Sequence, residues 1–182
     1  MYFEPKEIPD NKELKEFLGW RATCVTEAQS KNLIKKLGDQ IVMKARFVTY
    51  IAASEKPEKV ENGVAAFPKG AKILYYTMKN KEGKEFLPLF TSEEELEKWN
   101  LPKDGKVVPL LVIMNFDDLT PVFMTNTSLS GACINPMSDN FIMGRQMMST
   151  WTTQKRAMLN AALLKLTKEQ GGGEPRGPRP VK

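Results

Sequence analysis

The sequence predicts a single α+β domain in which a mixed β-sheet is covered by helices and a long helix ends the fold. Three observations lead to this class. The 182 residues match the usual size of one domain, and 41% of them are hydrophobic, as in chains that build one packed core. Segments with a helical period are interspersed with segments of strand period, without a regular βαβ order. We expect the domain over residues 1–170 and a flexible basic tail, rich in Gly and Pro, over residues 171–182.

Two helices are expected in the first forty residues, at 11–17 and 26–37. Each follows a side chain that can cap its first turn, and each is followed by a glycine, which favours the end of a helix. These boundary residues are Asp10, Asn11, Gly19, Thr26 and Gly38.

Strands are expected next along the chain. Residues 41–53 are rich in β-branched and aromatic side chains and alternate as a strand does, and a short strand is expected at 64–67. Residues 72–79 and 84–90 flank the polar turn 80–83, which ends in glycine. This pattern predicts a hairpin.

A helix should follow the hairpin directly and reach Trp99, because Thr91 with Glu94, or Ser92 with Glu95, can form a capping box. The remaining expected elements are strands at 107–114, 131–135 and 140–143 and helices at 117–125 and 145–168.

The last helix combines an apolar stripe with the excess positive charge of the chain. Only Lys155 interrupts the stripe. Residues 144–182 contain eight basic and two acidic residues, whereas the rest is nearly neutral; the formal net charge of the chain is +5. Such a distribution is typical of a solvated helix and a solubilising terminus. The stripe consists of Met148, Trp151, Met158, Leu159, Ala162 and Leu166.

Catalytic chemistry finds little support in the residues present. The chain has no histidine, which excludes a histidine base, a Ser–His or Cys–His nucleophile pair and a histidine metal ligand. Cys24 and Cys133 belong to no spaced cluster, and Cys133 lies in an apolar strand where a buried role is expected. We therefore name no catalytic residue, no cofactor and no metal site, and we expect no enzyme.

The start of the chain has no basic segment leading into an apolar one, as a secretory signal would. The longest aliphatic run, 107–114, is about half the length of the shortest spanning helix, roughly 17 residues. We expect a cytoplasmic protein that makes no membrane contact.

Two segments carry a resemblance to a known family. Residues 86–99 read FLPLFTSEEELEKW and residues 131–136 read GACINP, with a further short strand at 140–143. In order and spacing they resemble the strand-to-helix passage and the later strand and turn of the SseB N-terminal-domain family, the serine-sensitivity-enhancing proteins. The resemblance covers roughly residues 28–150 and implies an α+β fold, a bacterial cytoplasmic protein and a role in amino-acid sensitivity without a defined reaction.

Both motifs stand where a predicted strand ends, so we expect them to be neighbours at one edge of the sheet. The candidate binding residues are Phe90, Thr91, Ser92, Asn135, Pro136, Met137 and Asn140. Two interpretations remain open. Asn135 and Pro136 can simply fix a turn, or the edge can dock a partner, with methionines supplying adaptable apolar contact.

The function that we expect is a non-enzymatic, regulatory protein-binding module whose partner is another protein, with homo-oligomers as a further option. A first alternative is a thiol-dependent enzyme or accessory factor in sulfur or amino-acid metabolism. A second is nucleic-acid binding through the basic C-terminal helix and tail. We do not expect nucleic acid as the main partner, because aromatic residues are not interleaved with these charges.

Overall fold

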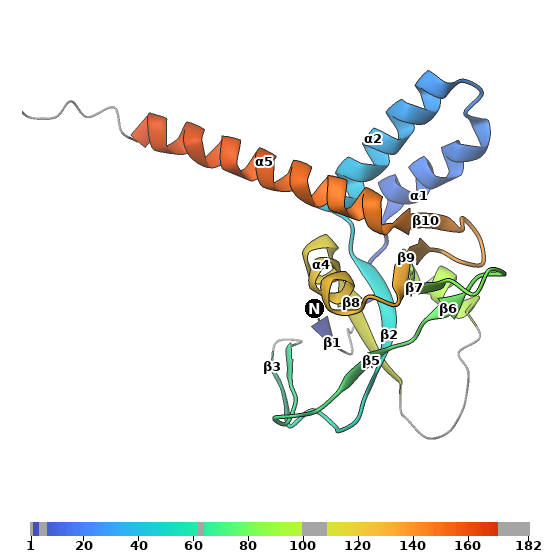
Figure 1. The fold of residues 1–182 in the computed structure, drawn as a ribbon, viewed down its shortest axis with the longest axis vertical. Coiled ribbons are helices and arrows are strands. Elements are labelled where there is room, and N and C mark those ends of the chain that lie inside the picture. The colour runs from blue at the N-terminus through green and yellow to red at the C-terminus, as the bar shows by residue number, and fades with distance from the viewer. Residues whose placement is uncertain (1, 4–6, 62–63, 100–108, 171–182) are drawn as a thin grey trace, which may run out of the picture.

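Two four-stranded sheets form the centre of the protein in a computed structural model, which describes residues 2–3, 7–61, 64–99 and 109–170. Helices α1, α2 and α5 lie on one side of these sheets, and the far half of α5 extends away from them (Figure 1). The predicted α+β class and the long C-terminal helix are therefore confirmed.

The first sheet is antiparallel and has the strand order β1-β8-β2-β5. β2 is its central strand, pairing with β8 along six residues and with β5 at its far end. The strands are β1 (Tyr2–Phe3), β2 (Phe47–Ala53), β5 (Ile73–Tyr75) and β8 (Pro109–Met114).

The second sheet is mixed and has the order β10-β9-β7-β6. β7 and β9 run parallel, and the two outer pairs are antiparallel. The strands are β6 (Met78–Lys79), β7 (Glu85–Leu89), β9 (Leu129–Ile134) and β10 (Phe141–Gly144). A separate two-stranded ribbon joins β3 (Lys59–Glu61) to β4 (Val64–Ala66).

The two sheets are joined at the point where β7 ends. Val48 and Phe90 exchange both backbone hydrogen bonds, each 2.9 Å long, and the buried Thr49 hydroxyl donates to the Pro88 carbonyl at 2.7 Å. One hydrophobic cluster therefore includes strands of both sheets together with buried residues of α1, α2, α4 and the first turns of α5.

Helices cover this core. They are α1 (Lys12–Gly19), the short 3₁₀ helix η1 (Trp20–Thr23), α2 (Glu27–Met43), α3 (Glu93–Glu97), α4 (Phe116–Thr125) and α5 (Arg145–Gln170). Thr26 and Gln29 form a complete capping box at the start of α2. Asn115 and Asp118 form another at the start of α4. The helix begins at Phe116, one residue before the start at 117 expected from the sequence.

The predicted boundary between the second helix and the first strand is wrong. α2 continues through Gly38 to Met43, so residues 41–43 are helical and the strand begins only at Phe47. Gly38 is a point of close approach, because a Cβ there would lie 2.8 Å from Trp151 Nε1. A glycine that leaves room for a neighbouring ring cannot be distinguished, from the local sequence alone, from a glycine that ends a helix.

The predicted hairpin is present but its first strand is divided. Residues 73–75 pair with β2 in the first sheet, and only residues 78–79 pair with β7 in the second. β1 and β3 were not expected from the sequence. Residues 107–108 of one predicted strand and the whole predicted tail, 171–182, lie outside the described residues.

No helix among the described residues is long and apolar enough to cross a bilayer.

Gly131 is a position where the sheet tolerates no side chain. It faces Gly144 across the β9–β10 pair, and a Cβ would overlap the carbonyl oxygen of Met143. We expect Gly131→Ala to lower the free energy of unfolding by about 1–3 kcal/mol, measured by urea denaturation. Gly19→Ala is the control, because Gly19 has helical φ and open space around it; its stability should be equal or higher. Equal stability of both variants would contradict the packing argument.

Candidate functional site

The two motifs expected at one edge of the sheet lie side by side. β7 and β9 are parallel neighbours, and their last residues, Leu89 and Ile134, are partners in register. Thr91 and Asn135, which follow these strand ends, therefore meet although 44 residues separate them. We call the predicted binding residues, Phe90, Thr91, Ser92, Asn135, Pro136, Met137 and Asn140, the strand-end cluster.

Asn135 is the hydrogen-bonding centre of the strand-end cluster. Its Oδ1 accepts from the backbone N–H of Thr91 at 3.0 Å, and its Nδ2 donates to Thr91 Oγ1 at 2.8 Å and to Asp139 Oδ2 at 2.6 Å. Its own N–H donates to the Leu89 carbonyl. The side chain is 1% exposed. These partners all belong to the protein itself, so Asn135 joins the two strand ends rather than presenting a free amide to solvent.

The turn after β9 uses two asparagines in the left-handed region. Asn135 has φ 48° and Asn140 has φ 45°, a conformation that asparagine tolerates better than most residues. The Asn140 N–H donates to the Asn135 carbonyl at 2.9 Å and closes the turn. From outside, Arg21 donates to the Asp139 carbonyl and lies over the Phe141 ring.

Asn11 joins the cluster, although the sequence indicated only a helix cap. Its side chain donates to the Thr91 carbonyl at 2.7 Å and to the Arg46 carbonyl, and accepts from the Arg46 N–H. It makes no side-chain cap on α1. No local pattern distinguishes these two uses of an asparagine before a helix, because the partners are distant in sequence.

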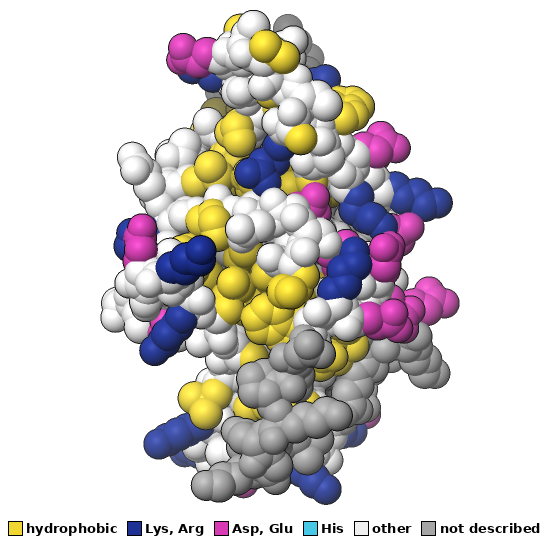
Figure 2. Space-filling view, turned by 90° about the vertical axis from the view of Figure 1, so that its right-hand side faces the viewer, with side chains coloured by type: hydrophobic (Ala, Val, Ile, Leu, Met, Phe, Trp, Pro, Cys, Tyr) yellow, Lys and Arg dark blue, Asp and Glu magenta, His cyan; other side chains and the backbone are white. Residues whose placement is uncertain are grey.

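The other members of the cluster differ in exposure. Phe90 is buried and its ring lies 5.8 Å from the ring of Trp99. Ser92 is also buried, and its hydroxyl has no hydrogen-bond partner within the described residues. Pro136 is half-buried, whereas Asn140 is exposed and Met137 is 61% exposed. Figure 2 shows hydrophobic side chains gathered on the face that carries the β9–β10 turn in Figure 1.

Nucleophilic chemistry has little support from the one cysteine in this region. Burial raises the pKa of the Cys133 thiol to about 11, against a smaller opposite effect of Arg21. The Sγ atom donates to Asn140 Oδ1 at 3.2 Å. In the described parts of the chain, no group of three or more Cys, Asp or Glu side chains is placed to hold a metal ion.

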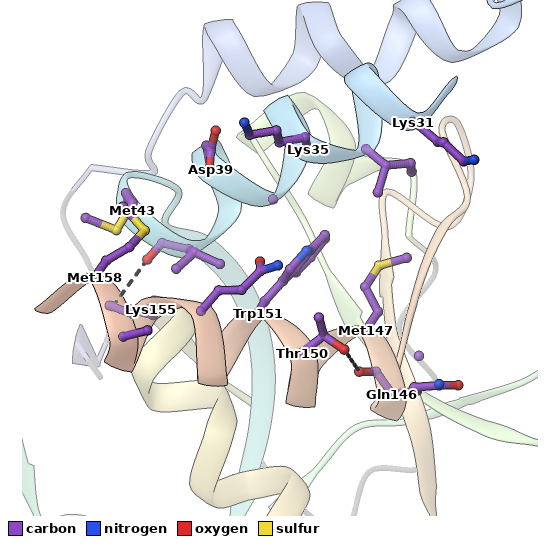
Figure 3. A pocket seen from close by; sticks show the side chains of 16 residues that line it. Lys31, Lys35, Asp39, Met43, Gln146, Met147, Thr150, Trp151, Lys155 and Met158 are labelled. Atoms are coloured by element: carbon purple, nitrogen blue, oxygen red, sulfur yellow. Dashed lines mark hydrogen bonds between the residues drawn. The ribbon is translucent and has the colours of Figure 1, made fainter. Parts of the chain in front are cut away.

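A groove of about 1030 Å³ runs between α2 and α5. In Figure 3 the Trp151 ring lies in its middle, with Met43 and Met158 at one end and Met147 near the other. Charges of both signs line it, among them Lys31, Lys35 and Asp39. The sequence does not predict this groove, because two helices far apart along the chain create it.

The far half of α5 carries exposed hydrophobic side chains. Met148 and Trp151, near the start of the helix, are 5% and 6% exposed, whereas Leu159 and Leu166 are 49% and 52% exposed. We call Leu159, Ala162, Leu163 and Leu166 the α5 stripe. The apolar pattern expected from the sequence is therefore present, but the protein covers only its first half.

Asn135→Ala should separate the two interpretations of the Asn-Pro turn. Loss of its buried hydrogen bonds and of a residue suited to positive φ should lower the free energy of unfolding by about 1–3 kcal/mol, measured by urea denaturation. Met137→Glu, in the same turn but exposed, is the control and should leave stability unchanged. If Asn135→Ala is as stable as the parent, the side chain does not hold the strand ends together.

Cys133 should resist thiol reagents in the folded protein, because a pKa of about 11 leaves almost no thiolate at pH 7. With Cys24→Ser, which removes the half-buried cysteine, labelling by a disulfide reagent should require denaturant. Rapid labelling of native Cys24→Ser would restore the case for a thiol-dependent reaction.

The comparisons with known proteins identify the family. A family model described as the SseB protein N-terminal domain matches residues 21–150. No curated protein and no solved structure matches the chain. The matched residues include the strand-end cluster and both four-stranded sheets except β1, and they end within the first turns of α5. The match covers well over half of the sequence, so this chain belongs to the SseB protein N-terminal domain family.

Proposed function

We propose that this SseB-family protein is a non-enzymatic, regulatory module that binds another protein, and that a helix of the partner packs on the α5 stripe. The observation that carries this proposal is the change in burial along one helix face. Hydrophobic residues that α5 buries near its start continue into its far half, where they are exposed.

The two halves of this face point in the same direction. Met148, Trp151 and Lys155 are followed eleven residues later by Leu159, Ala162 and Leu166, and eleven residues make about three helical turns. Met148 and Trp151 are buried. The Lys155 ammonium contacts Asp117 at 2.7 Å and the Val42 carbonyl at 3.2 Å. The stripe thus extends the surface through which α5 packs on the rest of the protein.

An uncovered stripe of this kind supports a protein contact. Helices gain most of their stability by packing an apolar face, and surface leucines that form a row mark interaction sites more often than isolated ones do. Covering the stripe would contribute about 25 cal/mol for each Å² of apolar surface removed from water. A helix is the occupant that we favour, since apolar residues spaced by three and four positions pack best against the same pattern.

The alternatives from the sequence have weaker support. A thiol-dependent reaction needs a thiolate, and the raised pKa of Cys133 disfavours it. Nucleic-acid binding would use the positive charge of α5 but gives no role to its exposed leucines. Cytoplasmic location in a bacterium and a part in serine sensitivity follow from the family resemblance and are proposed on that basis.

Photocrosslinking in the cell of origin tests the proposal. We expect a photoreactive amino acid at Leu159 or Leu166 to crosslink one discrete partner, and Leu163→Gln to reduce the yield because it removes apolar contact from the same stripe. The measurement is the mass and identity of the adduct.

Leu164 provides the matched control. It is 63% exposed but lies on another side of the helix from Leu159 and Leu166, so the probe placed there should give little adduct. No adduct at either stripe position, or equal adducts at all three, would contradict a partner that docks on the stripe. An adduct with the mass of two copies of this chain would replace the partner by self-association.

A further inference from the structure

We propose that the helix bound on the α5 stripe is acidic, with carboxylates on both sides of its apolar face; this inference rests on the proposed protein-binding function. The charges that border the stripe support such a partner. Residues 145–167 of α5 contain Arg145, Lys155, Arg156 and Lys165 and no aspartate or glutamate.

Two of these four charges are already used within the protein. Arg145 donates to the carbonyls of Phe123, Asn126 and Leu129, and so fixes the start of α5 to the end of α4 and to β9. Lys155 pairs with Asp117 and is mostly buried. Neither is available to a partner.

The other two charges border the stripe. Among the side chains that the structure describes, which in α5 run as far as Thr167, the ion pairs involve neither Arg156 nor Lys165. At 100° for each residue, Arg156 lies on one side of the stripe and Lys165 on the other. A partner helix seated on the leucines would therefore have a cation along each of its edges.

The same charges disfavour a second copy as the occupant. If two α5 helices packed through their stripes, basic residues of one copy would lie beside basic residues of the other, without a carboxylate between residues 145 and 167 of either. Like charges at an interface oppose association and exclude wrong partners. A helix with glutamate or aspartate at its flanks has the complementary pattern.

The charges that line the α2–α5 groove do not select between acidic and basic partners. Lys31 pairs with Glu27, and Lys35 stands with Asp39 among the residues that line the groove. Because both signs are present, the groove favours neither an acidic nor a basic ligand, and the inference is confined to the α5 stripe.

Two synthetic helical peptides of about 20 residues test this inference with the full chain. Both carry leucine at positions spaced by three and four; one has glutamate at the flanking positions and the other has lysine. Fluorescence anisotropy of labelled peptide, in low and high salt, measures binding. We expect the glutamate peptide to bind at least tenfold more tightly than the lysine peptide, with a difference that shrinks as salt rises.

Variants of the chain assign the effect to the residues named. Arg156→Glu combined with Lys165→Glu should reverse the preference between the peptides, while Leu159→Gln should weaken both and Leu164→Gln should weaken neither. These side chains are exposed and outside the core, so the melting temperature should not change. Failure of the double variant to alter the preference would overturn the inference.

The remaining outcomes separate this inference from the proposed function. Equal binding of both peptides, lost in Leu159→Gln, would overturn the acidic partner and leave the protein-binding function in place. No binding of the glutamate peptide up to millimolar concentration would also overturn it, and photocrosslinking at Leu159 would then decide the function alone. A dimer by sedimentation that Leu159→Gln dissociates would assign the stripe to a second copy. Tighter binding to phosphatidylglycerol vesicles than to the glutamate peptide would assign it to a lipid surface.

Discussion

The parallel pairing of β7 with β9 is the constraint on which the rest of the structure depends. Parallel neighbours need a long connection, and here that connection contains α3, β8 and α4, so that β8 enters the other sheet before the chain returns. The two sheets are therefore linked through the chain itself. Asn135 joins the two parallel ends through Thr91, and the Val48–Phe90 backbone pair attaches them to the first sheet.

This arrangement explains why the buried polar side chains at the strand ends make a poor case for catalysis. Most buried polar groups in proteins are hydrogen-bonded, and Asn135, Thr91 and Asn11 use their side chains to satisfy one another and nearby backbone groups. Cys133 lies beneath the same turn with a raised pKa. Met137 and Asn140 are the members of the strand-end cluster that the fold leaves exposed. The larger row of exposed apolar side chains lies elsewhere, on the far half of α5.

Helix α5 connects the fold to the proposed function. Its first turns belong to the core and to the residues that the family model matches, which end at 150, while the α5 stripe lies beyond them. The stripe thus adds a surface outside the matched region. In the function that we propose, its leucines would supply affinity and the bordering Arg156 and Lys165 would supply selectivity. Binding energy and partner choice would then come from different side chains of one helix.

The sequence by itself determined the α+β class, most of the helices and strands, the family motifs and the apolar pattern of the last helix, because these depend on periodicity and on capping residues within a few positions. Only the tertiary structure decided that residues 73–75 and 78–79 belong to different sheets, that Gly38 admits Trp151 instead of ending α2, and that Asn11 binds Thr91. Each of these depends on a partner remote in sequence. For the same reason the sequence predicted the stripe of α5 but not its exposure: a period shows that a helix face is apolar, whereas the packed fold determines what covers it.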